Sequence, residues 1–331
     1  MANLKSTEIT ETGFLQLPRG TTSERPASPS AGEIRFNTDT KICEWYDDQL
    51  GAWFPTGTVP PVATGGDTVE DIDIDGLTYR IHSFTTVGEN TFIITRSGQV
   101  DFLIVAGGAS GGSYGGGGGA GGLLTGQKKL KSGIFTVAVG AGGPGISTNS
   151  TSGINGQNSS ALGVTAIGGG GGGNNDTSTA DHSGLPGGSG GGASNQNVSS
   201  GNGGPGTPGQ GNSGGANTGG GNSGFRKSRG GGGAGQPADS GNGSELGNGG
   251  NGLALYLTDS VNMYAGGGGG HNWDNTDRAE GGIGGGGRGG SSNSGPENGQ
   301  LNTGSGGGGS EYNDTTGSGG SGVVIICYRI S

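Results

Sequence analysis

The chain has 331 residues, of which 89 are glycine, while only 27% are apolar and 13% are charged. A net charge of −10 argues against general binding to nucleic acid or to anionic membranes, because both need clustered Lys and Arg. The most apolar stretches, VDFLIVA and GVVIICY, are much shorter than the ~20 residues that a membrane-spanning helix needs. We therefore expect neither nucleic-acid binding nor membrane insertion.

Residues 1–62 are expected to form a small β module with a proline-rich arm and a linker. The stretches GEIRFNT and KICEWYD alternate apolar and polar residues, and the NTDT turn between them predicts a β-hairpin. DDQLGAWF predicts a second turn and a third short strand that carries Trp53. Because three strands bury too little apolar surface to be stable alone, the module should dock onto another protein or pair with copies of itself.

Residues 63–100 are expected to form a β-rich connector behind the linker TGTVPPVATGG. DIDIDGLTYRIHSF predicts two alternating strands joined at Asp75-Gly76, a dipeptide that favours a two-residue hairpin turn. NTFIITRSGQVDFLIVAGG predicts two more strands. No segment shows the helical period of about 3.6 residues, so the predicted fold class is all-β with almost no α-helix.

No pattern of catalytic or metal-binding residues stands out in the chain. Asp71, Asp73, Asp75 and Gly76 match the early positions of a calcium loop, but the last ligand position holds His82 instead of glutamate, which favours a strand. The three histidines lie far apart, no C-x-x-C pair occurs, and no GK dipeptide suggests a phosphate-binding loop. We therefore expect a protein that is not an enzyme and holds neither metal nor cofactor.

Glycine is concentrated in one part of the chain, because 79 of the 89 glycines lie between residues 106 and 322. Flexible linkers lack apolar residues between their glycines, whereas these runs follow strand-like stretches such as GIFTVAVGAGG and MYAGGGGG. A strand predicted at 322–330 must pair with strands that precede the glycine-rich region. Residues 101–331 are therefore expected to form an ordered glycine-rich domain that this strand closes.

Ordered polyglycine needs a geometry in which the backbone itself makes the contacts. Fixing one residue costs about 1–2 kcal/mol, and glycine lies at the unfavourable end of that range. Polyproline-II-like helices have about three residues per turn and point their N–H groups sideways, so glycine helices can exchange hydrogen bonds at close Cα spacing. The domain should be a stack of polyglycine-II helices on a small β-sheet framework.

Polar and aromatic residues interrupt the glycine runs and are expected to form loops. Their rings offer stacking faces and their charged groups offer directional hydrogen bonds, which suits saccharide or protein epitopes. The alternative is that the aromatic side chains anchor the loops to the stacked glycine helices or fill the axis of a trimer. The basic clusters at 128–131 and 225–229 are expected in solvated loops. The binding candidates are His271, Trp273, Asp274, Asp277, Arg278, Tyr312, Phe225 and Arg226.

Over residues 84–331 the chain resembles the glycine-rich domain of bacteriophage tail-fibre and virion proteins. This resemblance rests on VDFLIVAGGASGGSYGGGGGAGG, GIFTVAVGAGGPG, TAIGGGGGG, MYAGGGGGH and GGSGVVIICYRI, which occur in the order of that family. AGEIRFNTDTKICEWYDDQLGAWFPTG resembles short modules of phage fibre and virion proteins. A more distant likeness, of architecture alone, is to tail-fibre-tip adhesins that present loops on a polyglycine-II sandwich.

The resemblance implies a virion protein that is assembled in the host cytoplasm and acts as a tail fibre or receptor-binding protein. It implies attachment to other virion proteins through the N-terminal region, a homotrimer, and a host-surface saccharide or outer-membrane protein as the receptor. The alternative is a structural head-fibre, decoration or collar protein without a dedicated receptor. The attachment candidates are Ile34, Phe36, Trp45, Tyr46 and Trp53.

Overall fold

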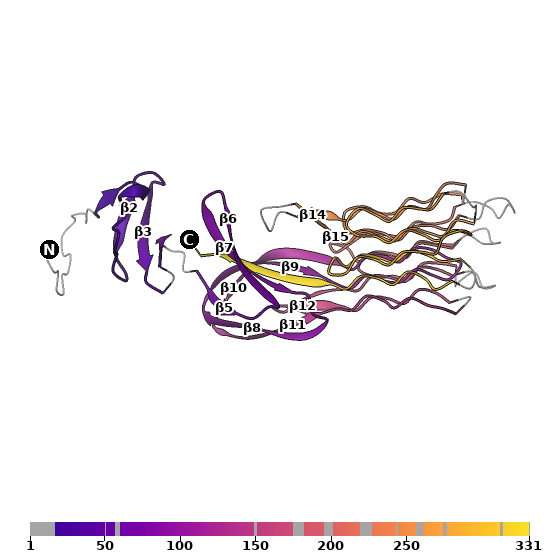
Figure 1. Ribbon diagram of the computed structural model, residues 1–331, viewed down its shortest axis with the longest axis horizontal. Helices are drawn as coiled ribbons and strands as arrows, with labels where there is room; N and C mark the ends of the chain where they lie inside the picture. Colours follow the sequence, from indigo (N-terminus) through magenta and orange to yellow (C-terminus); the bar gives the residue numbers. More distant parts are fainter. Residues whose placement is uncertain are drawn as a thin grey trace. The chain divides into compact units, whose positions relative to one another are not determined.

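The computed structural model contains two compact units, one within residues 1–59 together with 330–331 and one over residues 60–329 (Figure 1). The described residues are 17–49, 51–56, 60–148, 151–174, 182–194, 201–218, 227–242, 244–255, 261–273, 277–311 and 314–330. Their regular structure is β-strand apart from one short 3-10 turn, so the all-β prediction is confirmed. None of these residues belongs to a helix that could cross a bilayer.

The larger unit contains two five-stranded sheets and a two-stranded ribbon. The sheets have the strand orders β10-β9-β16-β7-β6 and β13-β12-β11-β8-β5. Their strands are β5 (Val62–Thr64), β6 (Thr68–Ile74), β7 (Leu77–Phe84), β8 (Gly88–Arg96), β9 (Gly98–Val105), β10 (Leu123–Leu130), β11 (Gly133–Val139), β12 (Ser159–Ala161), β13 (Val164–Ala166) and β16 (Val323–Arg329). The ribbon pairs β14 (Leu253–Leu255) with β15 (Asn262–Tyr264). The predicted connector 63–100 contributes strands to both sheets.

The strands predicted for the connector are present, and its first two form a hairpin. Asp75 and Gly76 take left-handed φ values of 51° and 78° at the turn between β6 and β7. Asp71 pairs with Arg80 across this hairpin at 2.8 Å, which fits the strand prediction and not the calcium loop. The closing strand is β16, and it lies between β7 and β9, antiparallel to both. Strands on the two sides of the glycine-rich region therefore pair, as predicted.

Apolar side chains fill the space between the two sheets. Phe84, Phe92, Ile104 and Ile326 are fully buried there. The rings of Phe84 in one sheet and Phe92 in the other meet edge to face with centroids 6.2 Å apart. Burial of side chains of this size stabilises the fold by about 1.5–3 kcal/mol each. This part of the unit is therefore a β-sandwich with an ordinary side-chain core.

A polar bridge built on His82 crosses the sandwich. His82 Nδ1 lies 2.7 Å from the carbonyl oxygen of Gly65, which can only accept, so Nδ1 carries the ring proton. Nε2 then accepts from the hydroxyl of Tyr328 at 3.2 Å, and that hydroxyl accepts from the N–H of Ala63 at 3.2 Å. Burial lowers the pKa of His82. Both nitrogens of the neutral ring are therefore satisfied.

Beyond the strands, the glycine runs form polyglycine-II helices that lie side by side (Figure 1). Along residues 116–122, every third N–H group reaches the same neighbouring run. The bonds run from Gly116, Gly119 and Gly122 to Gly173, Gly170 and Ile167; from Gly117 and Ala120 to Arg229 and Gly232; and from Gly118 and Gly121 to Gly307 and Gly304. This period of three is that of polyproline-II geometry, so the predicted stack is confirmed.

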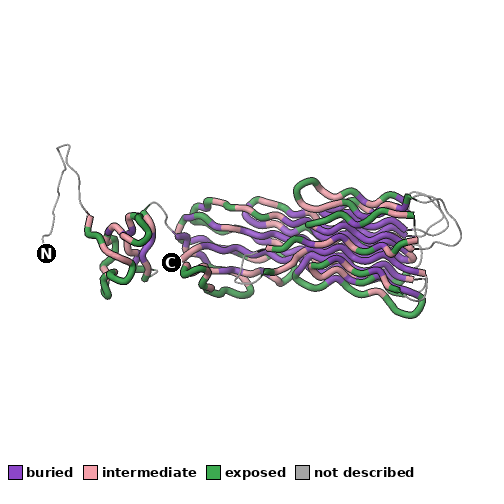
Figure 2. The backbone as a smooth tube through the Cα atoms, turned by 90° about the horizontal axis from the view of Figure 1, so that it is seen from above, coloured by how far each residue is buried: buried purple, intermediate pink, exposed green. Residues whose placement is uncertain are grey.

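Residues 115–122 lie at the centre of a hexagonal lattice of such helices. They donate to three neighbouring runs and accept from three others, which contain residues 106–112, 189–192 and 268–271. A Cβ atom on Gly118 would lie only 2.2 Å from the carbonyl oxygen of Ala109. Figure 2 shows that most of the tube in this lattice is buried. Only glycine fits at positions such as Gly118, which explains why the domain needs so much of it.

The described residues of the two basic clusters, 128–131 and 227–229, lie mostly in β10 or in the lattice, so their prediction as solvated loops is wrong there. Residues 225 and 226 lie outside the described residues. Lys128 and Lys129 belong to β10, which pairs along its whole length with β9. Arg229 is fully buried in the lattice. Its N–H donates to the carbonyl of Ala193 and its carbonyl accepts from the N–H of Gly117, so its backbone is part of the glycine lattice. A charged side chain therefore does not by itself mark a loop position in this domain.

The N-terminal unit is a four-stranded sheet with the order β1-β2-β3-β4. Its elements are β1 (Arg19–Gly20), η1 (Thr22–Glu24), β2 (Ile34–Asn37), β3 (Ile42–Asp47) and β4 (Ala52–Pro55). The predicted hairpin is β2–β3 and the predicted third strand is β4, so both are confirmed. The arm contributes a further strand, β1, which runs parallel to β2.

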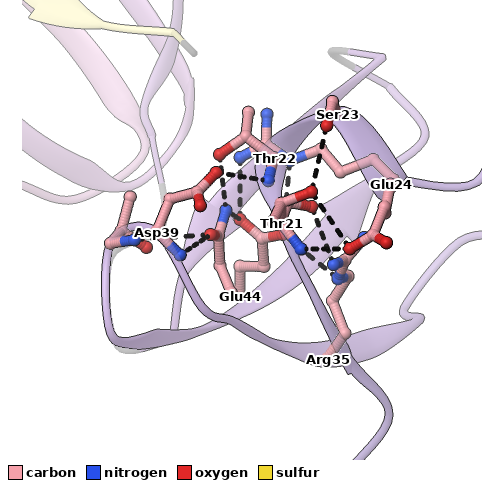
Figure 3. Close-up of polar contacts among 10 residues, drawn as sticks. Thr21, Thr22, Ser23, Glu24, Arg35, Asp39 and Glu44 are labelled. Carbon is pink, nitrogen blue, oxygen red and sulfur yellow. Dashed lines mark hydrogen bonds and ion pairs between the residues drawn. The ribbon is translucent and has the colours of Figure 1, made fainter.

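A buried polar network holds the arm against this sheet (Figure 3). The carboxylate of Glu44 accepts hydrogen bonds from Arg25 Nη2 at 2.7 Å and from Asn37 Nδ2 at 3.1 Å. Arg35 donates to the carbonyl of Thr21 at 2.9 Å. Burial raises the pKa of Glu44, but the hydrogen bonds from Arg25 and Asn37 outweigh burial, so the pKa lies below its usual value. An ionised carboxylate therefore fixes the arm.

Candidate functional site

The residues that flank the interruptions of the glycine runs meet at one end of the lattice, away from the sheets. They border the stretches 149–150, 175–181, 195–200, 219–226, 274–276 and 312–313, which lie outside the described residues. Hydrogen bonds join them, from Ser113 to Thr151 at 3.1 Å, from Ser194 to His182 at 2.9 Å, from Ser194 Oγ to Tyr114 at 3.0 Å, from Ser228 to His271 at 2.9 Å and from Ser310 to Gly112 at 3.2 Å. We call residues 113–114, 151, 182, 194, 227, 271–273, 277–278 and 310 the loop-anchor face.

The path of the chain explains why the anchors share one end. The chain leaves β9, runs outward through 106–112, reverses at Ser113-Tyr114 and returns through 115–122 to β10. Gly112 N–H donates to the carbonyl of Gly116 at 2.9 Å across this reversal. Other glycine runs also begin where a strand ends, as the run after β15 does. The ends of these runs that lie away from the sheets therefore meet at the same end of the lattice. The lattice therefore separates the sandwich from the loop-anchor face.

An aromatic cluster of Tyr114, His271 and Trp273 lies on this face. The ring centroid of Tyr114 lies 5.6 Å from that of His271 and 5.4 Å from that of Trp273. His271 and Trp273 meet edge to face at 6.4 Å. The sequence interpretation missed Tyr114, although the lone aromatic residue in GGSYGGGGG marks the reversal of its run. Trp273 remains partly exposed, so the cluster can offer a ring face to a ligand.

His271 is a lattice residue and not part of an exposed loop, which corrects its prediction as a surface contact. Its side chain is 1% exposed, and its N–H donates to the carbonyl of Gly115 at 3.0 Å. Among the described residues, neither ring nitrogen of His271 has a hydrogen-bond partner. Burial lowers the pKa of His271 to about 4, so the ring is neutral at pH 7. It supports its aromatic neighbours and is not positioned to reach a ligand directly.

Arg278 holds the chain in place after the undescribed residues 274–276, on the side opposite Trp273 in the sequence. Its Nε donates to the carbonyl of Gly289 at 2.8 Å, its Nη2 to that of Gly295 at 2.9 Å, and its Nη1 to the carboxylate of Glu297 at 3.0 Å. Asp277 is exposed, and its carbonyl accepts a hydrogen bond from Asn272. Arg278 thus has a clear anchoring role, whereas the carboxylate of Asp277 faces solvent.

Four predicted binding residues, Asp274, Tyr312, Phe225 and Arg226, lie outside the described residues. The polar interruption at residues 271–280 is not a loop along its whole length, because His271, Asn272 and Ala279 are buried in the lattice. Glycine content alone could not predict where the lattice ends and the interruption begins, since residues other than glycine also occupy lattice positions at the ends of runs.

The five attachment candidates lie on the two faces of the N-terminal sheet. Cross-strand pairing puts Ile34, Phe36 and Trp45 on one face, where Ile34 is 48% exposed. Tyr46 and Trp53 lie on the other face, with centroids 5.5 Å apart. Trp53 is buried beneath Arg35, whose guanidinium carbon lies 5.9 Å from the ring centroid. The first face can therefore contact a partner, and Trp53 is a core residue.

The described residues contain no candidate metal centre. No three His, Cys, Asp or Glu side chains among them gather in a way that could hold a metal ion. Both cysteines are free thiols.

Comparison with curated proteins gives no match. A family model described as a glycine-rich domain matches residues 85–329, from the end of β7 to the end of β16. The match covers well over half of the chain and spans the whole lattice. The chain therefore belongs to the glycine-rich domain family.

Proposed function

We propose that the chain is a non-enzymatic bacteriophage virion protein, a tail-fibre or receptor-binding protein that recognises the host through its loop-anchor face. The observation that carries this proposal is the convergence of the flanks of six interruptions at one end of the lattice. Binding residues commonly sit on loops that a rigid scaffold positions, because a rigid scaffold lowers the ordering cost of binding.

The chemistry of this face suits a saccharide or a protein epitope on the host envelope. Tyr114 and Trp273 supply adjacent aromatic rings, of which Trp273 is partly exposed. The exposed Asp277 adds a hydrogen-bond acceptor beside them. A net charge of −10 disfavours nucleic acid as the partner.

In this proposal the N-terminal unit attaches the protein to the particle. Its half-exposed apolar face with Ile34, Phe36 and Trp45 is the contact surface for other virion proteins or for further copies of the chain in a homotrimer. Apolar patches of this kind commonly mark interaction surfaces. Assembly would take place in the host cytoplasm, before the virion is released.

A structural role without a dedicated receptor, in a head fibre, decoration or collar, is the second candidate. It is favoured by two of the predicted receptor-binding residues, whose side chains are engaged within the chain. His271 is buried, and each side-chain nitrogen of Arg278 donates a hydrogen bond within the chain. In this reading the aromatic cluster stabilises run ends.

Competition for adsorption separates the two candidates. Full-length protein, preincubated with host cells, should block adsorption of the phage, and Trp273→Ala should lose most of this inhibition while it unfolds at nearly the same temperature. Ile134→Ala, on the exposed surface of β11, is the matched control and should block like the native chain. Absence of any inhibition by saturating native protein would overturn the receptor-binding proposal in favour of the structural one.

A further inference from the structure

We propose that the outer face of the β10-β9-β16-β7-β6 sheet carries a binding site for a short neutral saccharide, separate from the loop-anchor face. A groove of about 460 Å³ lies on this face and is lined in part by Tyr79, Asp101, Thr125, Gln127 and Cys327. This volume falls within the roughly 300–1,000 Å³ that is common for small-ligand sites. The proposal does not depend on whether the loop-anchor face binds a receptor.

The strand register brings these groups together on one face. Asp101 lies directly between Gln127 of β10 and Cys327 of β16. Cys327 is paired with Ile81, and Tyr79 lies two residues before Ile81 on the same face of β7. Three central strands and one edge strand therefore contribute to a single concave surface.

Gly126 makes room for the groove at its edge. Gly126 pairs with Phe102, and a Cβ on this glycine would lie 2.9 Å from the Cζ atom of the Phe102 ring. A glycine inside a strand often marks a close approach of this kind. The ring of Phe102 can therefore lie beneath β10 and line the groove, although it belongs to the opposite face of the sheet.

Most polar groups of the groove lack a hydrogen-bond partner among the described residues. Among the described residues, no hydrogen bond satisfies the hydroxyl of Tyr79, the carboxylate of Asp101 or the hydroxyl of Thr125. Gln127 accepts a hydrogen bond from Gln99 at 3.0 Å through its carbonyl oxygen, which leaves its amide donors available. Donors and acceptors thus converge on one space, as they do in sites that orient a polar ligand.

The floor between these groups is apolar. Cys327 is 6% exposed, and burial together with the charge of Asp101 raises the pKa of its thiol to about 12. The thiol is therefore neutral and behaves as a small apolar group. The ring of Tyr79 adds an aromatic surface beside it.

This combination selects the chemical class of the ligand. An apolar ligand would cover Tyr79, Asp101 and Thr125 without giving them partners, which is unfavourable. An anionic ligand would be repelled by Asp101 and by the net charge of −10. A neutral sugar presents hydroxyl groups around its ring and an apolar C–H face, so it satisfies the polar groups and packs on Tyr79.

Binding to the full-length chain can be measured by saturation-transfer NMR and calorimetry with lactose, maltose and diacetylchitobiose. We expect at least one of these disaccharides to bind, and Asp101→Asn to weaken its affinity about tenfold, as expected for loss of a hydrogen bond to a charged group. Tyr79→Leu should weaken binding similarly. Glu89→Gln, an exposed carboxylate outside the groove, should leave the affinity unchanged.

Thermal unfolding of each variant checks that it remains folded, and Asp101→Asn keeps the test valid if Tyr79→Leu fails to fold. The proposal is overturned if none of the three sugars binds up to about 50 mM, a limit that corresponds to negligible affinity. It is also overturned if folded Asp101→Asn binds like the native chain. Loss of binding only in Trp273→Ala would assign the sugar to the loop-anchor face and contradict the groove.

Discussion

In the β-sandwich, side chains fill the space between backbones, whereas in the glycine lattice the backbones fill that space themselves. Phe84 and Phe92 meet across the two sheets, and Gly118 meets Ala109 with no room for a methyl group. Apolar burial stabilises the first region, and sideways hydrogen bonds between runs stabilise the second. The two regions should therefore respond in opposite ways to changes of side-chain volume.

The two regions also treat a buried histidine differently. His82 in the sandwich has a partner for each ring nitrogen. His271 in the lattice has none among the described residues. The two buried rings therefore differ in how well their polar atoms are satisfied.

The largest expected effect is that of a methyl group at the centre of the lattice. Gly118→Ala must displace neighbouring runs and break several hydrogen bonds of about 1 kcal/mol each, so we expect a loss of about 4 kcal/mol or more in the free energy of unfolding. The matched control is Gly295→Ala, because no atom lies within 4 Å of its added Cβ. This control should be neutral or slightly stabilising, and equal effects in denaturant titrations would contradict the lattice packing.

Removal of volume should be the damaging change in the sandwich. Ile104→Ala empties a fully buried site between the two sheets and should cost about 3 kcal/mol, within the range for such truncations. Ile134→Ala makes the same kind of change at a side chain that is 75% exposed, and should cost less than about 0.5 kcal/mol. Similar unfolding midpoints for both variants would argue against a side-chain core between the sheets.

Acid should weaken the lattice through His271. Its pKa is about 4 in the folded chain against an ordinary value of 6.5, so between these values the unfolded chain binds more protons. The free energy of unfolding must then fall as pH falls, by about 1.4 kcal/mol per unit, or about 2 kcal/mol at pH 5.

His271→Phe removes this titration and keeps an aromatic ring, so its stability should change less between pH 7 and pH 5. His82, whose pKa is also lowered, remains in both proteins and cancels in the comparison. Equal losses in the native chain and in the variant, measured by denaturation at both pH values, would show that the ring of His271 is hydrated or paired.

The smallest effect concerns the buried charge of Arg229. Burial lowers the pKa of Arg229 despite the charges of Glu245 and Asp239, and its Nε and Nη2 have no hydrogen-bond partner among the described residues, so the charge is poorly compensated. Arg229→Met should leave stability unchanged or raise it by about 1 kcal/mol. Arg288→Met, at a half-exposed ion pair with Glu280, is the control and should change stability by less than about 1 kcal/mol. A large loss in the Arg229 variant would mean that the guanidinium is well paired.

Much of the architecture could be predicted because it follows from local rules. The alternation of DIDIDG and its Asp75-Gly76 turn define one hairpin, and a stack of polyglycine-II helices satisfies the backbone of the glycine runs. The order of the lattice could not be predicted, since identical glycine runs do not encode that Gly118 bonds to Gly307. The fit of Tyr114 beside His271 depends on that order, so the aromatic cluster could not be predicted either.

The central claim is that the lattice holds the loop-anchor face away from the particle. Electron cryo-microscopy of virions that contain this protein tests it most directly. We predict density for the loop-anchor face, with Tyr114 and Trp273, at the outermost end, and for the β-sandwich nearer the particle. A map in which the loop-anchor face lies against the particle, with the β-sandwich pointing outward, would contradict it.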